Sequence, residues 1–327
     1  MSPMKFPRIC KKITAVCCAA AAICTPLAGC STADDSKLKI VTTVFASYDF
    51  AKQLTADLDV PCEVSLLLTP GGESHSYEPT PADVAKIQSC DLFVYVGGAS
   101  EKWAEDLIVS TKRTEKQNLR LFDCIVPLEE EHIEGMELDE EDAHSHADAD
   151  EIEYDEHIWT SPENACLIAK NIAAALKTAV PASAEKISSA ETVLTADLDA
   201  LQAEYQAVAD KANGNTLIFA DRFPFRYLTQ AYGWKYYAAF AGCSSDTDAS
   251  AATLSFLISK VKEDHIKTVF YLENSSQKIS DAVCQATGAK AVMMQSCNNV
   301  SQADFDAGKH FQAFMRENLA AIEEALG

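Results

Sequence analysis

The stretch ASAEKISSAETVLTADLDALQAEYQAVADKA, residues 182–212, is a long run with helical spacing and no strand signal. It is rich in Ala, Leu, Glu and Gln, which favour helices, and Asn213-Gly214 follows it as a C-terminal stop signal. At 1.5 Å per residue, a helix of this length spans about 45 Å. Because only one such element is present, a stiff beam between two bodies explains it better than a coiled coil does. We therefore expect a linking helix at 181–213.

Residues 162–180 precede this helix and are also helical in pattern, with Ser161 as N-cap and Pro162 in the first turn. Before and after these two helices, short runs of β-branched and aromatic residues alternate with stretches of helical periodicity. This alternation is typical of parallel α/β units. Strands are expected at 38–45, 62–68, 91–96, 119–123, 216–220, 234–240, 268–272 and 290–294. Helices are expected at 47–56, 81–88, 101–111, 224–231, 251–264, 276–287 and 303–325. The fold class is therefore α/β, with two lobes that each carry a mainly parallel sheet flanked by helices, joined by one long helix.

The N-terminus has the three parts of an export signal, since a basic region and an apolar run, residues 13–23, precede Leu27-Ala28-Gly29-Cys30. The sequence Leu27-Ala28-Gly29-Cys30 resembles a lipobox, in which Cys30 would carry the lipid anchor. The apolar run of eleven residues is too short to span a membrane comfortably. The expected organisation is a signal peptide at 1–29, an anchor linker at 30–36, a first lobe at 37–180, the linking helix at 181–213 and a second lobe at 214–327.

The net charge of the whole chain is −22. Removal of the signal peptide takes away four basic and no acidic residues, so the remainder has 23 basic and 49 acidic residues and a net charge of −26. This balance argues against binding to nucleic acid or to an anionic membrane surface. Besides Cys30, seven cysteines remain, without the spacing of a disulfide framework or a CxxC zinc site. Most are expected to be small core residues, and one pair could form a disulfide.

Residues 129–156 contain fifteen Asp or Glu, no Lys or Arg, and the histidines His132, His144 and His146. A carboxylate-dense segment repels itself into an extended state, and interspersed imidazoles are weak, exchangeable ligands for zinc. The alternative is a solvated acidic loop without a ligand. We expect the loop to gather or sense zinc without forming the main site.

Two histidines lie in contexts that suit fixed metal ligands. His75 lies in the loop after the second expected strand, where ligands bind in open α/β sheets, and glycines and prolines restrict this loop. His157 directly follows the acidic loop, in Asp155-Glu156-His157-Ile158-Trp159. Taken alone, either histidine is more often an ordinary surface residue.

The combination resembles the zinc and manganese solute-binding lipoproteins of ABC importers. The resemblance rests on Pro-Gly-Gly-x-x-His-x-Tyr-Glu-Pro-Thr-Pro around His75, the acidic loop, and Asp155-x-His157-x-Trp159. Matches in the second lobe are Tyr227-Leu228, Tyr232-Gly233, Phe270-Tyr271-Leu272-Glu273 and Met315-Arg316-Glu317-Asn318. The resemblance implies two lobes with a divalent ion in the cleft, held by two ligands from each lobe. His75 and His157 are the implied ligands of the first lobe.

The second lobe departs from the family pattern, because Arg222 stands where relatives usually have a histidine. Arginine stays protonated and has no free lone pair, so it cannot replace this ligand. The substitutes are Asp221 and Glu273, with Cys243 and Cys297 as alternatives. Asp221 could instead pair with Arg222, Glu273 could orient a ligating histidine, and the cysteines could be thiolate ligands, a disulfide or core residues.

The leading hypothesis is a lipid-anchored, exported and monomeric receptor that binds Zn(II), with Mn(II) as the alternative, and delivers it to an ABC permease and its ATPase. The metal would be the transported ligand, and the chain would not be an enzyme. One rival is a receptor for a chelated or organic anionic ligand, or a surface adhesin. A zinc hydrolase is disfavoured, because no His-Glu-x-x-His motif is present.

Overall fold

The computed structural model describes residues 37–72, 77–137, 153–244 and 248–327. Its first sheet is wholly parallel in the order β2-β1-β3-β4. The strands are β1 (Leu38–Thr42), β2 (Cys62–Leu66), β3 (Leu92–Tyr95) and β4 (Asn118–Arg120). The helices between them are α1 (Phe45–Thr55), α2 (Pro81–Ser89) and α3 (Lys102–Thr111). These elements form the first lobe.

The second lobe repeats this plan, with a parallel sheet in the order β6-β5-β7-β8. The strands are β5 (Thr216–Phe223), β6 (Lys235–Ala241), β7 (Thr268–Leu272) and β8 (Lys290–Met294). The helices are α7 (Arg226–Tyr232), α8 (Ala251–Glu263), α9 (Lys278–Thr287), α10 (Gln302–Asp306) and α11 (Phe311–Leu326). The predicted single helix at 303–325 is therefore two helices, separated at residues 307–310.

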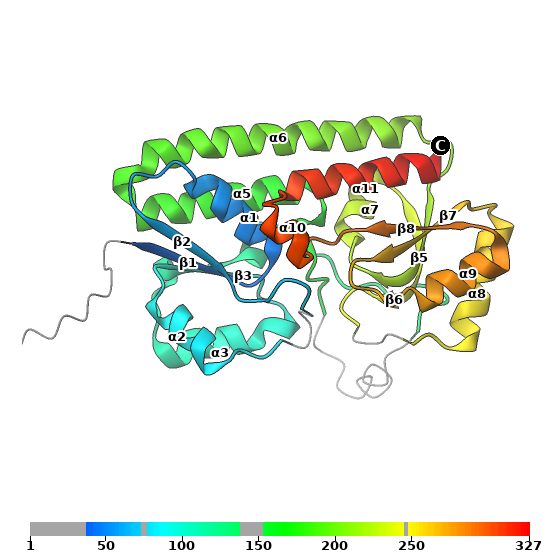
Figure 1. The fold of residues 1–327 in the computed structure, drawn as a ribbon, viewed down its shortest axis with the longest axis horizontal. Coiled ribbons are helices and arrows are strands. Elements are labelled where there is room, and N and C mark those ends of the chain that lie inside the picture. Colours follow the sequence, from blue (N-terminus) through cyan, green and yellow to red (C-terminus); the bar gives the residue numbers. More distant parts are fainter. Residues whose placement is uncertain (1–36, 73–76, 138–152, 245–247) are drawn as a thin grey trace, which may run out of the picture. The chain divides into compact units, whose positions relative to one another are not determined.

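Two helices join the lobes in sequence, α5 (Pro162–Ala179) and the 28-residue α6 (Ala184–Lys211). Ser161 caps α5, as predicted, because its side chain accepts from the backbone N–H of Asn164 at 3.3 Å. Figure 1 shows α6 running the length of both sheets, with α5 and α11 beneath it. The helix contacts α1 and α5 of the first half of the chain and α7 and α11 of the second half, and Tyr205 donates to the carbonyl of Met315 at 2.7 Å. The predicted fold class is confirmed.

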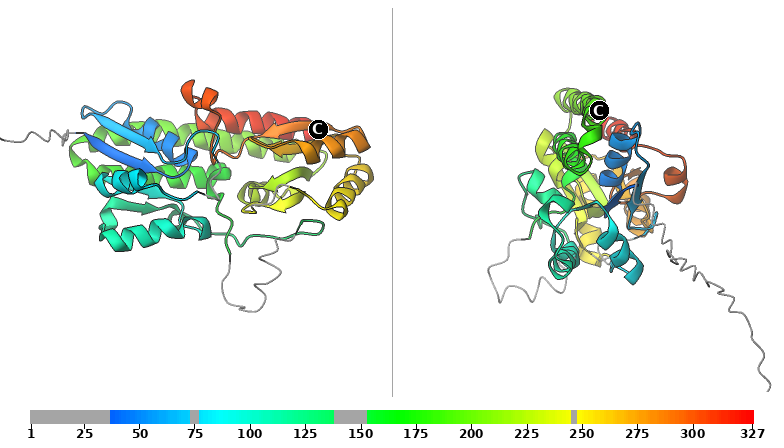
Figure 2. Two further views of the ribbon diagram at one scale, coloured as in Figure 1. Left: turned by 60° about the horizontal axis from the view of Figure 1, so that its bottom comes forward. Right: turned by 90° about the vertical axis from the view of Figure 1, so that its left-hand side faces the viewer.

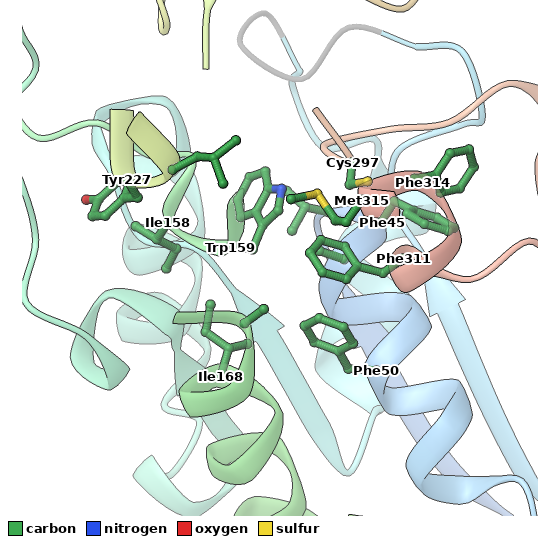
Figure 3. Packing of buried hydrophobic residues seen from close by; sticks show 14 of the residues in the cluster. Phe45, Phe50, Ile158, Trp159, Ile168, Tyr227, Cys297, Phe311, Phe314 and Met315 are labelled. Atoms are coloured by element: carbon green, nitrogen blue, oxygen red, sulfur yellow. The ribbon is translucent and has the colours of Figure 1, made fainter. Parts of the chain in front are cut away.

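One hydrophobic core runs through both sheets and the helices α1, α5, α6 and α11. Figure 3 shows its centre, where Trp159 lies between the helix that carries Ile168 and the aromatic side chains of Phe45 and Phe311. The Trp159 indole N–H donates to the carbonyl of Ser296 at 2.8 Å, so a residue from the first half of the chain is bonded into the second lobe. Residues 36–327 form one compact unit, and the predicted boundaries at 180 and 213 stay predictions.

Residues 128–137, which we call the strap, leave the first lobe and lie against the second (Figure 2). The backbone N–H of Glu137 donates to the carbonyl of Ala239 at 2.8 Å, and Met136 is buried in the core. The expectation of an extended, self-repelling acidic run is therefore wrong for its described first part. Here hydrogen-bond donors of the second lobe compensate the carboxylates. No helix in the described ranges is long and apolar enough to cross a membrane.

Candidate metal site

A cavity of ≈ 210 Å³ lies where the carboxyl ends of β2, β5, β6, β7 and β8 converge. The loops that follow these strands line the same cavity, as expected for the ligand site of an open α/β sheet. Its walls include Gly72 after β2, Arg222 at the end of β5, Gly242 after β6, Glu273 after β7 and Asn298 after β8. His157, from the segment before α5, completes the wall. The structure therefore brings two predicted ligands, His157 and Glu273, to the same cavity.

The imidazole of His157 is held in one orientation by Asp155. One Asp155 oxygen lies 3.2 Å from Nδ1 of His157 and also accepts the backbone N–H of His157 at 2.8 Å. An Nδ1 proton shared with this carboxylate leaves the lone pair on Nε2, the arrangement of a metal-ligating histidine with a carboxylate partner. Burial alone would lower the pKa of His157, but Asp155, Glu130 and Glu156 outweigh burial and raise the pKa.

Second-lobe groups fix Asp155 in turn. The Tyr227 hydroxyl donates to the carbonyl of Asp155 at 2.9 Å and accepts the backbone N–H of Leu128 at 3.0 Å. Gly242 packs directly on the pair, since a Cβ at this position would lie 3.2 Å from Asp155 Oδ2 and 3.3 Å from His157 Nδ1. The orientation of His157 therefore depends on residues of both lobes.

Glu273 presents a carboxylate to the cavity from the end of β7. It accepts hydrogen bonds from the backbone N–H and the hydroxyl of Ser296, the former at 2.8 Å. The Gln295 amide, oriented with its nitrogen toward the carboxylate, donates to both oxygens at 2.8 and 2.9 Å. Burial raises the pKa of Glu273 to about 7, although Ser296 and Arg222 oppose this shift. A buried carboxyl of this kind gains from a cation that replaces its proton.

Asp221, the other predicted carboxylate ligand, has a different position. One of its oxygens accepts the backbone N–H of Arg222 at 2.9 Å, and the other accepts that of Leu272 at 3.2 Å. Asp221 is not among the residues that line the cavity. It ties the end of β5 to the end of β7, whereas Arg222 itself lines the cavity. The alternative of an Asp221–Arg222 side-chain ion pair is not seen among the ion pairs of the described residues.

The two cysteines considered as ligands are free thiols in separate environments. Cys297 is completely buried among Phe45, Phe314 and Met315 (Figure 3). Burial raises the pKa of its thiol well above the ordinary value, so a thiolate there is disfavoured. Of the three alternatives for Cys297, the structure favours core packing. Cys243 is half-buried beside the cavity, and burial with nearby carboxylates raises the pKa of its thiol as well.

Sequence reasoning missed residues that the tertiary structure places at the site. Asn298 and Asn299 line the cavity, and the Asn299 amide donates to the carbonyls of Thr69 and Gly72 at 2.8 Å. A smaller cavity of ≈ 20 Å³ beside His157 is lined by Glu101 and Glu156, among others. Burial raises the pKa of Glu101 to about 7. The position of Glu101 three residues after the Gly97-Gly98 pair that follows a buried strand was the available signal.

Several predicted residues lie outside the described ranges, namely Cys30, His75, His144 and His146. Gly71 and Gly72, which begin the loop of His75, do line the cavity. His132 lies exposed on the strap. Within the described ranges alone, no group of three or more His, Cys, Asp or Glu side chains is arranged to hold a metal ion.

Most of the chain matches one known protein family. Residues 40–325 match the family described as zinc-uptake complex component A, periplasmic, ZnuA. The chain belongs to the ZnuA family. Members of this family are described as a component of a zinc-uptake complex and not as enzymes. This description agrees with the prediction that the chain is not an enzyme.

Two relatives illustrate the family. The high-affinity zinc uptake system protein ZnuA of Bacillus subtilis is 32% identical over 305 residues, which cover 91% of this chain and 90% of that protein. The zinc-binding lipoprotein AdcA of Streptococcus pneumoniae is 30% identical over 291 residues, which cover 89% of this chain. The match spans only 56% of AdcA, so the chain corresponds to about half of that relative.

Solved structures of other proteins have the same fold as this chain. The Zn(II)-bound ZnuA-like domain of Streptococcus pneumoniae AdcA has a TM-score of 0.72 at 27% identity, covering 89% of this chain and 99% of that one. The metal-dependent lipoprotein YcdH of Bacillus subtilis also has a TM-score of 0.72, at 29% identity, covering 89% and 100%. The laminin-binding protein Lmb of Streptococcus agalactiae, described as an adhesin with metal-transporting activity, has a TM-score of 0.71 at 26% identity, covering 89% and 100%.

Proposed function

We propose that the chain captures a divalent metal ion, with Zn(II) favoured over Mn(II), and delivers it to an ABC permease and its ATPase. The observation that carries this proposal is the shared cavity of His157 and Glu273, in which the imidazole is oriented by a buried carboxylate. An imidazole ligand suits zinc better than manganese, which prefers oxygen ligands. The match to a zinc-uptake family supports the same function.

The proposed ligand set is His75, His157 and Glu273. His75 is included because the glycines that precede it line the cavity. Asp221 is left out because both of its oxygens already accept backbone N–H groups. Two neutral imidazoles and one carboxylate leave a coordination position for water or for an anion.

We also propose that the chain is exported, cleaved before Cys30 and held at the outer face of the cell membrane by a lipid on that cysteine, as a monomer. The support is the lipobox-like Leu27-Ala28-Gly29-Cys30 and a relative described as a lipoprotein. Replacement of Cys30 by serine should release the protein from the membrane fraction into the medium. Retention of that variant in the membrane would contradict the lipid anchor.

Metal content of gently purified protein tests the main proposal. With no metal added, mass spectrometry of the wild-type chain should find close to one equivalent of zinc. His157→Ala and Glu273→Ala should lose it, whereas His265→Ala, which removes an exposed histidine at the far end of the second lobe, should retain it. Zinc retained by both cavity variants would overturn the proposed site.

A second candidate is favoured by Arg222, whose side chain lines a cavity proposed for a cation. A guanidinium beside a metal ion repels it, unless an anion lies between the two charges. If the cargo supplies this anion, it is a metal chelate or an organic anion. Zinc affinity measured with and without excess citrate separates the two candidates, since only the second requires the anion.

A further inference from the structure

The strap, residues 128–137, makes a second connection between the lobes in addition to α6. Its outgoing arm pairs with the returning chain, because the N–H of Glu130 donates to Glu153 at 2.9 Å and the N–H of Asp155 donates to Leu128 at 3.0 Å. An antiparallel bridge between Glu129 and Tyr154 lies between these bonds. The returning arm then leads directly into His157. The strap and the metal-site histidine are therefore part of one paired structure.

The far end of the strap is fixed on the second lobe at α8. Glu137 accepts the N–H of Ser250 and the hydroxyl of Thr253, both at 2.8 Å, at the N-terminus of this helix. These bonds lower the pKa of Glu137 and use the favourable interaction of a carboxylate with a helix N-terminus. Gly135, at φ +90°, lies against Phe256 so closely that a Cβ would come within 2.1 Å of the ring.

The middle of the strap is held by Glu131, which accepts from the Tyr236 hydroxyl at 3.0 Å and lies 3.3 Å from Nε of Arg226. Both partners belong to the second lobe, on β6 and α7. The strap is thus anchored along its length by hydrogen bonds to its carboxylates and by one ion pair. Because the strap continues from the first lobe, separation of the lobes across the cavity would strain these contacts.

Glu130 connects this anchoring to the metal site. Its Oε1 accepts the backbone N–H of Cys243 at 2.9 Å, and Cys243 follows Gly242 in the turn after β6. Gly242 lines the cavity and packs against Nδ1 of His157 and the carboxylate of Asp155. The bond from Glu130 therefore holds the second-lobe wall against the imidazole.

We propose that the strap is a latch across the cavity and that Glu130 is a positioning residue, which holds the Gly242-Cys243 turn against His157 and so slows release of the bound metal. This inference rests on the proposed function for its kinetic consequence, whereas the contacts of the latch join protein groups only. Glu130 does not need to touch the ion. Its effect acts through the turn and therefore falls on the dissociation rate.

Three variants test the latch. Glu130→Ala removes the acceptor, Glu130→Gln keeps an amide oxygen as acceptor, and Glu134→Ala removes an exposed carboxylate of the same strap as a charge-matched control. Zinc dissociation is measured by mixing the loaded protein with excess chelator. Glu130→Ala should release zinc at least about tenfold faster than wild type, as expected for loss of a hydrogen bond to a charged group. Glu130→Gln should recover most of the difference, and Glu134→Ala should match wild type.

Hydrogen exchange of the Cys243 amide in metal-free protein gives a readout that does not depend on metal binding. Glu130→Ala should accelerate this exchange, whereas the amides of β1 should exchange as in wild type. Unchanged exchange would overturn the latch even if the protein binds zinc as proposed. Faster exchange in a protein that never binds zinc would support the latch and contradict the proposed function. Equal zinc release by Glu130→Ala and Glu134→Ala would show that only charge matters and would overturn the positioning role.

Discussion

Nδ1 of His157 lies 3.2 Å from Oδ1 of Asp155, and each side chain is only 3% exposed. In this environment the carboxylate determines which imidazole nitrogen carries the proton, and hence which one can bind a metal. Asp155 is two residues away in sequence, but its carbonyl is held by Tyr227 of the second lobe. The pair is therefore oriented from both lobes.

Replacement of Asp155 by asparagine should weaken zinc binding about 10- to 100-fold, the range typical for loss of a partner that orients a metal-ligating histidine. The amide can donate to Nδ1 and so favour the wrong tautomer. Competition calorimetry against a chelator of known affinity measures the change. Asp123→Asn, at an exposed ion pair with Arg120, serves as the control and should have no effect.

Zinc affinity should fall as the pH decreases through about 7. His157 must be neutral to bind, and its pKa is raised above the ordinary value, so protons begin to compete at higher pH than for a free histidine. Glu273, with a pKa of about 7, must also lose its proton. Affinity should therefore be fully developed above pH 8 and lower at pH 6. Calorimetry in buffers of different ionisation enthalpy should detect proton release, and a constant affinity from pH 6 to 8 would be incompatible with this site.

Replacement of Arg222 by histidine should tighten zinc binding by about tenfold or more, because it removes a repelling charge and adds a ligand on the cavity wall. Arg222→Met removes the charge without adding a ligand. If the two variants bind zinc equally well, the gain comes from electrostatics alone. If Arg222→Met abolishes binding, the arginine has a positive role, as expected for an anion-bound cargo.

Replacement of Trp159 by phenylalanine should lower the free energy of unfolding by about 1–3 kcal/mol, because the buried carbonyl of Ser296 loses its donor. Urea denaturation of the metal-free protein measures this change. Trp103→Phe, at a half-buried indole over α2 and β3, should cost less. An effect of Trp159→Phe no larger than that of Trp103→Phe would contradict the importance of the interlobe bond.

Cys297→Ala should leave zinc affinity unchanged, since the thiol is completely buried in the core and does not line the cavity. It should lower the free energy of unfolding by about 1 kcal/mol, as expected for a small buried truncation. Metal titration and urea denaturation of the same sample measure both quantities. A loss of affinity without a loss of stability would return Cys297 to the list of ligands.

The fold was largely predictable from local patterns. Helical spacing over residues 182–212 and alternating runs on both sides predicted two parallel sheets and the long helix, because hydrophobic periodicity reflects the face that each element must bury. The break between α10 and α11 was missed although Gly308, which adopts a positive φ there, is a residue that commonly ends a helix.

By itself, the sequence identified His157 and Glu273 as candidate ligands, since residue chemistry and position after a strand can be read locally. Only the tertiary structure decided that Asp221 braces two strand ends, that Cys297 is a core residue and that Glu130, Glu131 and Glu137 anchor a strap on the second lobe. The physical reason is that a carboxylate or thiol has several possible partners. Which partner it meets depends on segments about 100 residues apart, such as Glu130 and Cys243, whose pairing no local pattern records.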